Sequence, residues 1–157
     1  MKENLPQRKN IRISNYDYSN TGIYFITICI KNREKILSKI EKEKIVLYQY
    51  GKIVEKYILT INAKYNYICI NSYVIMPNHI HILCEIKEYK NSKFSYNATI
   101  PFVISTLKRL TNKEFRENIW QRNYYEHIVR NEEEYQKILE YIQNNPINWE
   151  KDKYFSF

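Results

Sequence analysis

Two histidines stand at alternate positions in the apolar segment YVIMPNHIHIL, residues 73–83. In a β-strand, residues two apart point to the same face, about 6.6 Å apart at a rise of about 3.3 Å per residue. His79 and His81 therefore predict two neighbouring imidazoles, whereas Ile80 and Ile82 point into the core. Paired imidazoles are a natural beginning for a divalent-metal site. The alternative is two surface histidines on the open face of a half-buried sheet.

The last predicted helix offers an oxygen ligand and a phenol. Tyr141 and Asn145 are four residues apart, so they lie together on one flank of that helix. Pro146 ends the helix, because proline disfavours helical geometry in the residue before it. The amide carbonyl of Asn145 could complete the coordination shell of a metal, with Tyr141 one turn earlier. The alternative for Tyr141 is a packing tyrosine, since the chain has 16 tyrosines. The apolar stripe beside this flank consists of Tyr135, Ile138, Leu139 and Ile142.

Strand and helix patterns alternate around these groups. Asn131 can cap the last helix, with Glu134 as its capping-box partner. The order β-α-β-β-α-β-α predicts an α+β fold: a ferredoxin-like split βαβ with an antiparallel sheet, helices on one face, and a C-terminal helix. The predicted strands are 23–31, 65–76, 79–86 and 120–130, and the predicted helices are about 47–64, from 100 onward with Pro101 in its first turn, and 131–146.

Composition narrows the classes of function. A chain of 157 residues predicts a single domain, with a basic arm at 1–22, a core at 23–146 and a tail at 147–157. The chain has only 2 glycines, which is too few for a Walker phosphate loop or a dinucleotide-binding fingerprint. A net charge of +8 indicates a polyanionic partner, most often nucleic acid. The three cysteines lie in apolar runs and predict buried free thiols, and the lack of a long apolar segment predicts a cytoplasmic protein.

Four segments, in this order, resemble the REP-associated tyrosine transposases of the HUH single-strand transposase superfamily. They are NYDYSNTGIYFITICIKNRE, YVIMPNHIHIL, WQRNYYEHIVRNEEEY and YIQNNPINWEKD, and the resemblance covers roughly residues 12–152. It implies that His79 and His81 match the family's metal ligands, that Asn145 matches the third ligand, and that Tyr141 matches the nucleophile.

The resemblance implies a metal-dependent single-stranded DNA endonuclease and strand-transferase that acts at DNA hairpins. In that chemistry, Tyr141 attacks the scissile phosphorus and leaves a 5′-phosphotyrosine and a free 3′-hydroxyl. The expected cofactor is Mg²⁺ or Mn²⁺. Exchange of the last helix between two subunits, as relatives with one tyrosine can do, would make the protein a homodimer. The alternative function is a catalytically inactive hairpin DNA-binding protein on the same fold. A 2H-type phosphoesterase is discounted, because it needs two separated His-x-Thr/Ser motifs and this chain has one His-Ile-His pair.

Basic and aromatic side chains are the candidates for binding DNA, by ion pairs with phosphates and by stacking on unpaired bases. The candidates are Arg12, Tyr16, Lys108, Arg109, Arg122, Tyr124 and His127, with Trp120 as a further stacking residue. The alternative is solvated surface for the charged residues and a structural surface position for His127. Tyr124 and Tyr125 are the alternative nucleophiles.

Overall fold

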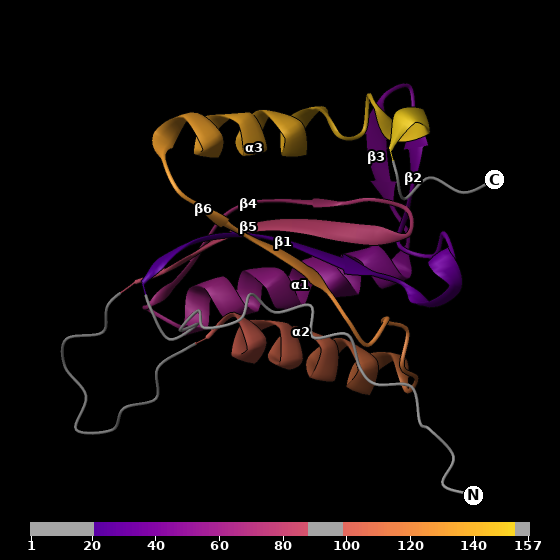
Figure 1. Cartoon of the computed structure of the whole chain (residues 1–157). Coiled ribbons are helices and arrows are strands. Elements are labelled where there is room, and N and C mark those ends of the chain that lie inside the picture. The colour runs from indigo at the N-terminus through magenta and orange to yellow at the C-terminus, as the bar shows by residue number, and fades with distance from the viewer. Residues whose placement is uncertain (1–20, 88–98, 153–157) are drawn as a thin grey trace, which may run out of the picture.

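The computed structural model describes residues 21–87 and 99–152. Its centre is an antiparallel sheet with the strand order β4-β5-β1-β6 (Figure 1). The central strand β1 pairs with β5 on one side and with β6 on the other, and β4 pairs with the outer edge of β5. The bounds are β1 Gly22–Cys29, β4 Ile68–Ile75, β5 His79–Ile86 and β6 Tyr125–Val129.

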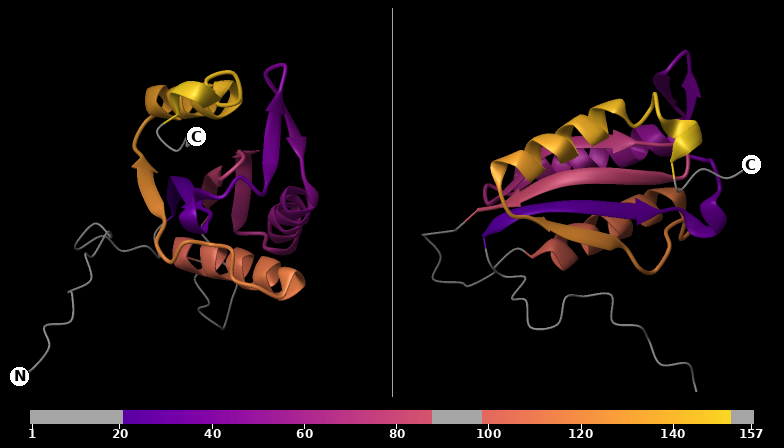
Figure 2. Two further views of the ribbon diagram at one scale, coloured as in Figure 1. Left: turned by 90° about the vertical axis from the view of Figure 1, so that its right-hand side faces the viewer. Right: turned by 45° about the horizontal axis from the view of Figure 1, so that its top comes forward.

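Helices cover both faces of this sheet. Helices α1 (Gln49–Lys64) and α2 (Ile100–Phe115) lie on one face, and α3 (Glu132–Asn144) lies on the other (Figures 1 and 2). This arrangement confirms the predicted α+β class with an antiparallel sheet, two helices on one face and a C-terminal helix. None of the helices in the described residues has the length and apolar character of a membrane span. All three cysteines are free thiols, but only Cys84 is buried as predicted, whereas Cys29 and Cys69 are partly exposed.

Each face of the sheet has its own apolar cluster. Ile80 and Ile82 are buried in the larger cluster on the side of α1 and α2, as the alternation predicts. Burying one such side chain stabilises the fold by about 1.5–3 kcal/mol. The smaller cluster lies under α3 and includes Leu83, Ile142 and Trp149. The predicted stripe on α3 packs against it, which fixes how the helix is turned over the sheet.

Two parts of the fold differ from the sequence prediction. Strands β2 (Ser38–Glu41) and β3 (Lys44–Leu47) form a hairpin that was not predicted. Its turn consists of Lys42 and Glu43, at φ 48° and 63°, whereas glycine or asparagine is usual in such a turn, so the sequence lacks the usual signal. The hairpin stands beside the C-terminal 3₁₀ helix η2 (Trp149–Lys151); a second such helix, η1 (Lys31–Arg33), follows β1 (Figure 1). The predicted strand 120–130 is interrupted in the structure: Trp120 forms an isolated bridge with Ile30, and the regular strand β6 begins only at Tyr125.

Gly51 of α1 meets the backbone of Leu37. A Cβ atom at this position would lie 2.2 Å from the carbonyl oxygen of Leu37. We expect Gly51→Ala to lower the free energy of unfolding by about 1–3 kcal/mol, because this overpacking exceeds the gain in helix propensity of about 1 kcal/mol. Urea denaturation measures the change, with exposed Thr60→Ala in the same helix as the control, expected within about 0.5 kcal/mol of wild type. Equal stability of Gly51→Ala and wild type would contradict the close contact.

Candidate active site

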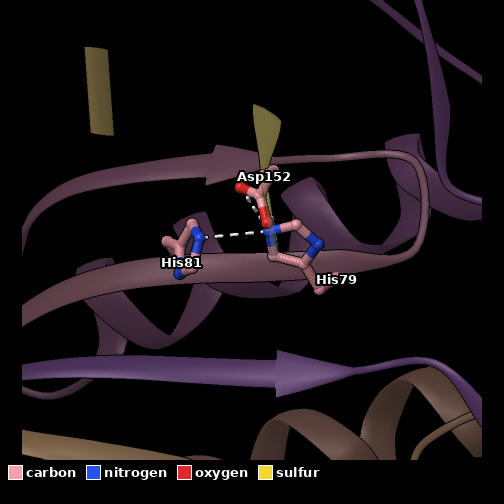
Figure 3. Close-up of side chains that lie close together, drawn as sticks. All are labelled: His79, His81 and Asp152. Carbon is pink, nitrogen blue, oxygen red and sulfur yellow. Dashed lines mark hydrogen bonds and ion pairs between the residues drawn. The ribbon is translucent and has the colours of Figure 1, made fainter. Parts of the chain in front are cut away.

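The two histidines of β5 lie on the face of the sheet that α3 covers. Pairing with β1 places His79 opposite Cys29 and His81 opposite Thr27. Both histidine side chains are buried, at 0% and 1% exposed, so they are not surface histidines of an open sheet. Their Nε2 atoms are 3.0 Å apart, and their rings meet at 72° (Figure 3). The strand therefore brings the same nitrogen of both rings to one point.

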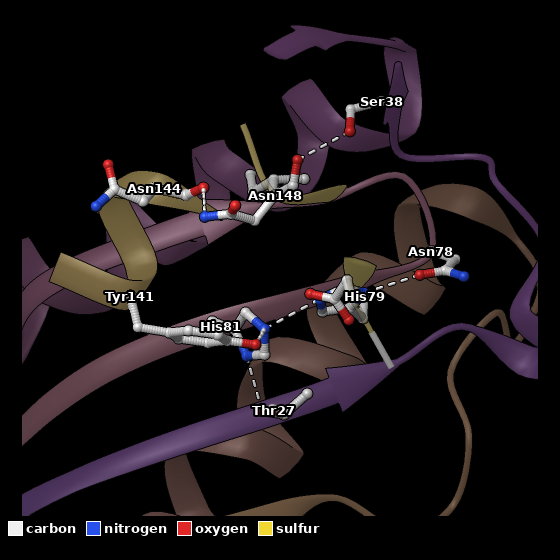
Figure 4. Close-up of polar contacts among 10 residues, drawn as sticks. Thr27, Ser38, Asn78, His79, His81, Tyr141, Asn144 and Asn148 are labelled. Carbon is white, nitrogen blue, oxygen red and sulfur yellow. Dashed lines mark hydrogen bonds and ion pairs between the residues drawn. The ribbon is translucent and has the colours of Figure 1, made fainter. Parts of the chain in front are cut away.

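The outer nitrogens of the pair are held by neighbouring side chains. Nδ1 of His79 is 2.8 Å from the carboxamide oxygen of Asn78, and Nδ1 of His81 is 2.8 Å from the hydroxyl of Thr27 (Figure 4). The oxygen of Asn78 only accepts, so His79 carries its proton on Nδ1 and presents an Nε2 lone pair. The hydroxyl of Thr27 can donate or accept, so His81 can present either an Nε2 proton or a lone pair. Histidines that ligate a metal are oriented in this way by partners on the other nitrogen.

Asp152 joins the pair from beyond the end of α3. Its Oδ2 lies 3.9 Å from Nε2 of His79, and its side chain is 2% exposed (Figure 3). The ligand atoms of His79, His81 and Asp152 all lie within 4.8 Å of one another. The chain reaches this point through η2, in which Trp149 is buried with its ring 6.0 Å from that of His79. Asp152 lies in the predicted tail and was not predicted as a site residue; Trp149, three residues earlier, was the available signal that this segment packs.

Tyr141 lies at the open side of the histidine pair. Its Oη is 3.4 Å from Nε2 of His81, and the two rings meet edge to face at a centroid distance of 5.3 Å (Figure 4). Phe25 of β1 stacks on His81 and meets the edge of Tyr141, so it fills the space between sheet and helix. Tyr141 is nevertheless 41% exposed. A phenol in this position can be reached from solvent while its oxygen faces the buried imidazoles.

Asn145 is the buried end of α3. The residue is 2% exposed, and its side-chain oxygen Oδ1 has no hydrogen-bond partner in the described part of the chain. A buried carbonyl without a partner costs about 1–3 kcal/mol, and such a group calls for an explanation. A metal ion bound to this oxygen would explain why it has no hydrogen-bond partner. The donor set of His79, His81 and Asp152, two imidazoles and a carboxylate, fits a divalent cation of the Mn²⁺ or Mg²⁺ type.

A pocket of about 460 Å³ opens beside Tyr141, between α3 and the sheet. His127 and Tyr125 of β6 and Lys137 of α3 line it together with His81. His127 is held by the carboxylate of Glu134, which also accepts the backbone N–H of Arg130 at 2.7 Å. The N–H of Arg130 and the imidazole of His127 lower the pKa of the Glu134 carboxyl. The pocket therefore has the positioned imidazole of His127 and the ammonium of Lys137, which pairs with Glu133.

Glu134 also belongs to the capping structure of α3. The side chain of Asn131 accepts from the backbone N–H of Glu134 at 2.8 Å, as predicted. The return bond goes to Arg130 rather than to Asn131. This cap fixes the start of α3 two turns before Tyr141 and so contributes to the placement of the phenol.

The remaining candidates for binding DNA lie elsewhere. Lys108, Arg122 and Tyr124 line a second pocket next to α2, and Arg109 is exposed on α2. Arg12 and Tyr16 lie outside the described residues. The prediction that Trp120 stacks on DNA bases is wrong. Trp120 is 1% exposed and its Nε1 donates to the hydroxyl of Thr111 at 2.8 Å, so the ring packs in the core and has no face for a base.

Comparison with known proteins adds independent findings. The family model described as "Transposase IS200 like" matches residues 19–145. An uncharacterized protein of Haemophilus influenzae is 36% identical over 170 residues, which cover 96% of this chain and 94% of that protein. The REP-associated tyrosine transposase of Escherichia coli K12 is 26% identical over 130 residues, which cover 83% of this chain and 69% of that protein.

A solved structure has a similar fold. It is a REP-associated tyrosine transposase bound to a REP hairpin, with a TM-score of 0.64 and 23% sequence identity. The match covers 90% of this chain and 77% of that one.

Proposed function

This chain belongs to the IS200-like transposase family and is a relative of the REP-associated tyrosine transposases, and we propose that it cleaves and rejoins single-stranded DNA at hairpins in a metal-dependent reaction. The observation that carries this proposal is the position of the Tyr141 phenol, 3.4 Å from a histidine nitrogen that belongs to a cluster of metal-type ligands. A nucleophile and a set of ligands at one point, open to solvent on one side, are what phosphodiester transesterification requires.

Tyr141 is the nucleophile of the proposed reaction. Its Oη attacks the scissile phosphorus, the bond from phosphorus to the 3′-oxygen breaks, and the products are a 5′-phosphotyrosine and a free 3′-hydroxyl. A phenol has an ordinary pKa near ~10, so its proton must leave as it attacks. The later attack of a 3′-hydroxyl on the phosphotyrosine reverses the exchange and rejoins DNA without an external energy source.

His79, His81, Asn145 and Asp152 are the residues that would hold the metal. When bound there, Mg²⁺ or Mn²⁺ would polarise a non-bridging phosphate oxygen and offset the charge of the transition state. Mixed nitrogen and oxygen donors favour affinity for Mn²⁺, whereas abundance favours Mg²⁺. Because Asp152 belongs to this group, we extend the proposed catalytic core beyond residue 146.

The geometry supports an active site made by one chain. Helix α3 packs on its own sheet through Ile142, and this contact holds Tyr141 over His81 of the same chain. A second subunit is therefore not required to supply the nucleophile, whether or not the protein forms a homodimer.

The test is formation of a protein–DNA adduct that survives denaturation. The chain is mixed with 5′- and 3′-labelled hairpin oligonucleotides that carry single-stranded extensions, with Mn²⁺, with Mg²⁺ or with EDTA. We expect adduct only with metal, with the protein joined to the new 5′ end of the fragment downstream of the break, so that the 3′ label and not the 5′ label follows it. We also expect affinity for the hairpin to fall steeply with salt. Hairpin binding without adduct under any metal would overturn the nuclease proposal in favour of an inactive hairpin-binding protein.

A further inference from the structure

A second pocket lies between α2 and the segment that leads into β6. Its volume is about 370 Å³, within the range of about 300–1,000 Å³ that is usual for sites of small ligands. Phe102, Ser105 and Lys108 line it from α2, and Arg122 and Tyr124 line it from the segment before β6. None of the described residues that form its lining is acidic. Two cations without a lining carboxylate favour an anionic ligand.

Lys108 is built into the wall of this second pocket. Its ammonium donates to the carbonyl oxygens of Gln121 at 2.7 Å and Arg122 at 3.2 Å. These two bonds hold the segment before β6 against α2. An ammonium has three N–H donors, so one remains for a ligand. Burial lowers the pKa of Lys108 to about 8, and an anion in the pocket would favour its charged form.

The walls of the pocket are aromatic. Phe102 is 38% exposed although it is large and apolar, and its inner side packs edge to face on Tyr65. The ring of Tyr124 lies on the other wall, 5.9 Å from the ammonium of Lys108. Aromatic rings next to cations are the usual means by which proteins bind unpaired nucleotides, since every base has a face to stack and every nucleotide a phosphate.

The second pocket and the site of Tyr141 lie on opposite faces of one edge strand. Among the strands of the described residues, β6 pairs with β1 alone and is the outermost of the sheet. Tyr125 lines the pocket under α3, and its neighbour Tyr124 lines the pocket next to α2. Helices α3 and α2 cover opposite faces of the sheet (Figure 2). A single strand that passes around the edge at β6 can therefore reach both pockets, whereas a rigid duplex cannot make that turn.

We propose that the second pocket binds one unpaired nucleotide of the single-stranded DNA next to the hairpin, with its phosphate at Lys108 and Arg122 and its base against Phe102 and Tyr124. The inference rests on the proposed function only for the identity of the ligand as single-stranded DNA. It assigns a positioning role to a site that is separate from the reacting atoms.

The test compares hairpins with and without single-stranded extensions on either side of the stem. Fluorescence anisotropy gives the gain in affinity that the extension supplies. We expect Phe102→Ala and Arg122→Gln to reduce that gain on the order of 10-fold, a larger loss of affinity than either variant shows with the bare hairpin. The controls are Leu59→Ala and Lys52→Gln, which remove an exposed apolar and an exposed charged side chain from α1. Both should bind as wild type.

Photo-crosslinking locates the nucleotide directly. Hairpins with 5-iodouracil at each extension position are irradiated with the protein, and the crosslinked peptides are identified by mass spectrometry. Crosslinks at Phe102 or Tyr124 from one position of the extension are expected. Crosslinks confined to the pocket beside Tyr141, or an unchanged gain in both variants, would overturn the inference. If the protein forms the adduct but both variants keep the full gain in affinity, only the proposed nucleotide pocket is rejected. If crosslinks form at this pocket but no adduct appears, only the proposed nuclease activity is rejected.

Discussion

Replacement of Tyr141 by phenylalanine is expected to abolish the covalent protein–DNA adduct and to leave affinity for the hairpin within about twofold of wild type. The substitution removes one oxygen, without which no phosphotyrosine can form. That oxygen lies 3.4 Å from His81 in a side chain that is 41% exposed, so its loss costs little packing. The ring keeps its edge contacts with Phe25 and His81. Labelled hairpin, Mn²⁺ and denaturing electrophoresis measure the adduct, and anisotropy measures affinity.

Tyr125→Phe is the matched control. Tyr125 is 44% exposed and lines the same pocket as Tyr141, but it comes from the edge strand β6 and not from α3. We expect this variant to form adduct at a rate close to wild type. Adduct in Tyr141→Phe together with its loss in Tyr125→Phe would transfer the role of nucleophile to the strand. Because the two variants lose the same atom from the same pocket, a general effect on DNA binding would show in both.

The sequence could predict those parts of the site that a single element determines. The period of a strand places His79 and His81 on one face, and the spacing of Tyr141 and Asn145 places both on one flank of α3. The first prediction describes the structure, in which the alternate residues Ile80 and Ile82 are core. For the second, the structure shows that the apolar stripe beside Tyr141 faces the sheet. A pattern of this kind needs no knowledge of the rest of the fold.

Such patterns could not predict contacts between segments that lie far apart in the sequence. Asp152 lies near His79 because η2 turns the chain back toward the sheet and buries Trp149. No periodic pattern in the sequence predicts this turn. The predicted strand is interrupted between Trp120, which bridges Ile30, and Tyr125, and in this interval the ammonium of Lys108 binds the carbonyls of residues 121 and 122. Backbone groups engaged by a lysine side chain are not available to a neighbouring strand. Tertiary interactions of this kind override local propensity.

Loss of the metal ligands gives the second large effect. We expect His81→Ala to abolish adduct formation at any concentration of Mn²⁺, because the variant lacks one of two converging nitrogens at the centre of the ligand set. EDTA should have the same effect on wild type, with recovery when excess Mn²⁺ is added. Removal of single oxygen ligands should be milder. For Asp152→Asn and Asn145→Ala, the half-saturating concentration of Mn²⁺ should rise on the order of 10- to 100-fold, with activity partly restored at high metal.

Binding of Mn²⁺ followed by electron paramagnetic resonance separates metal affinity from catalysis. Asp152→Asn preserves the size of the side chain and removes its charge, so a weaker site in this variant identifies the carboxylate as a ligand. The alternative role of Asp152 is an ion pair with protonated His79 across 3.9 Å. In that case the variant would bind Mn²⁺ as tightly as wild type and would lose stability instead. Tight Mn²⁺ binding in Asp152→Asn and weak binding in Asn145→Ala would leave the two histidines and the end of α3 as the metal site, and the segment after α3 as its structural support.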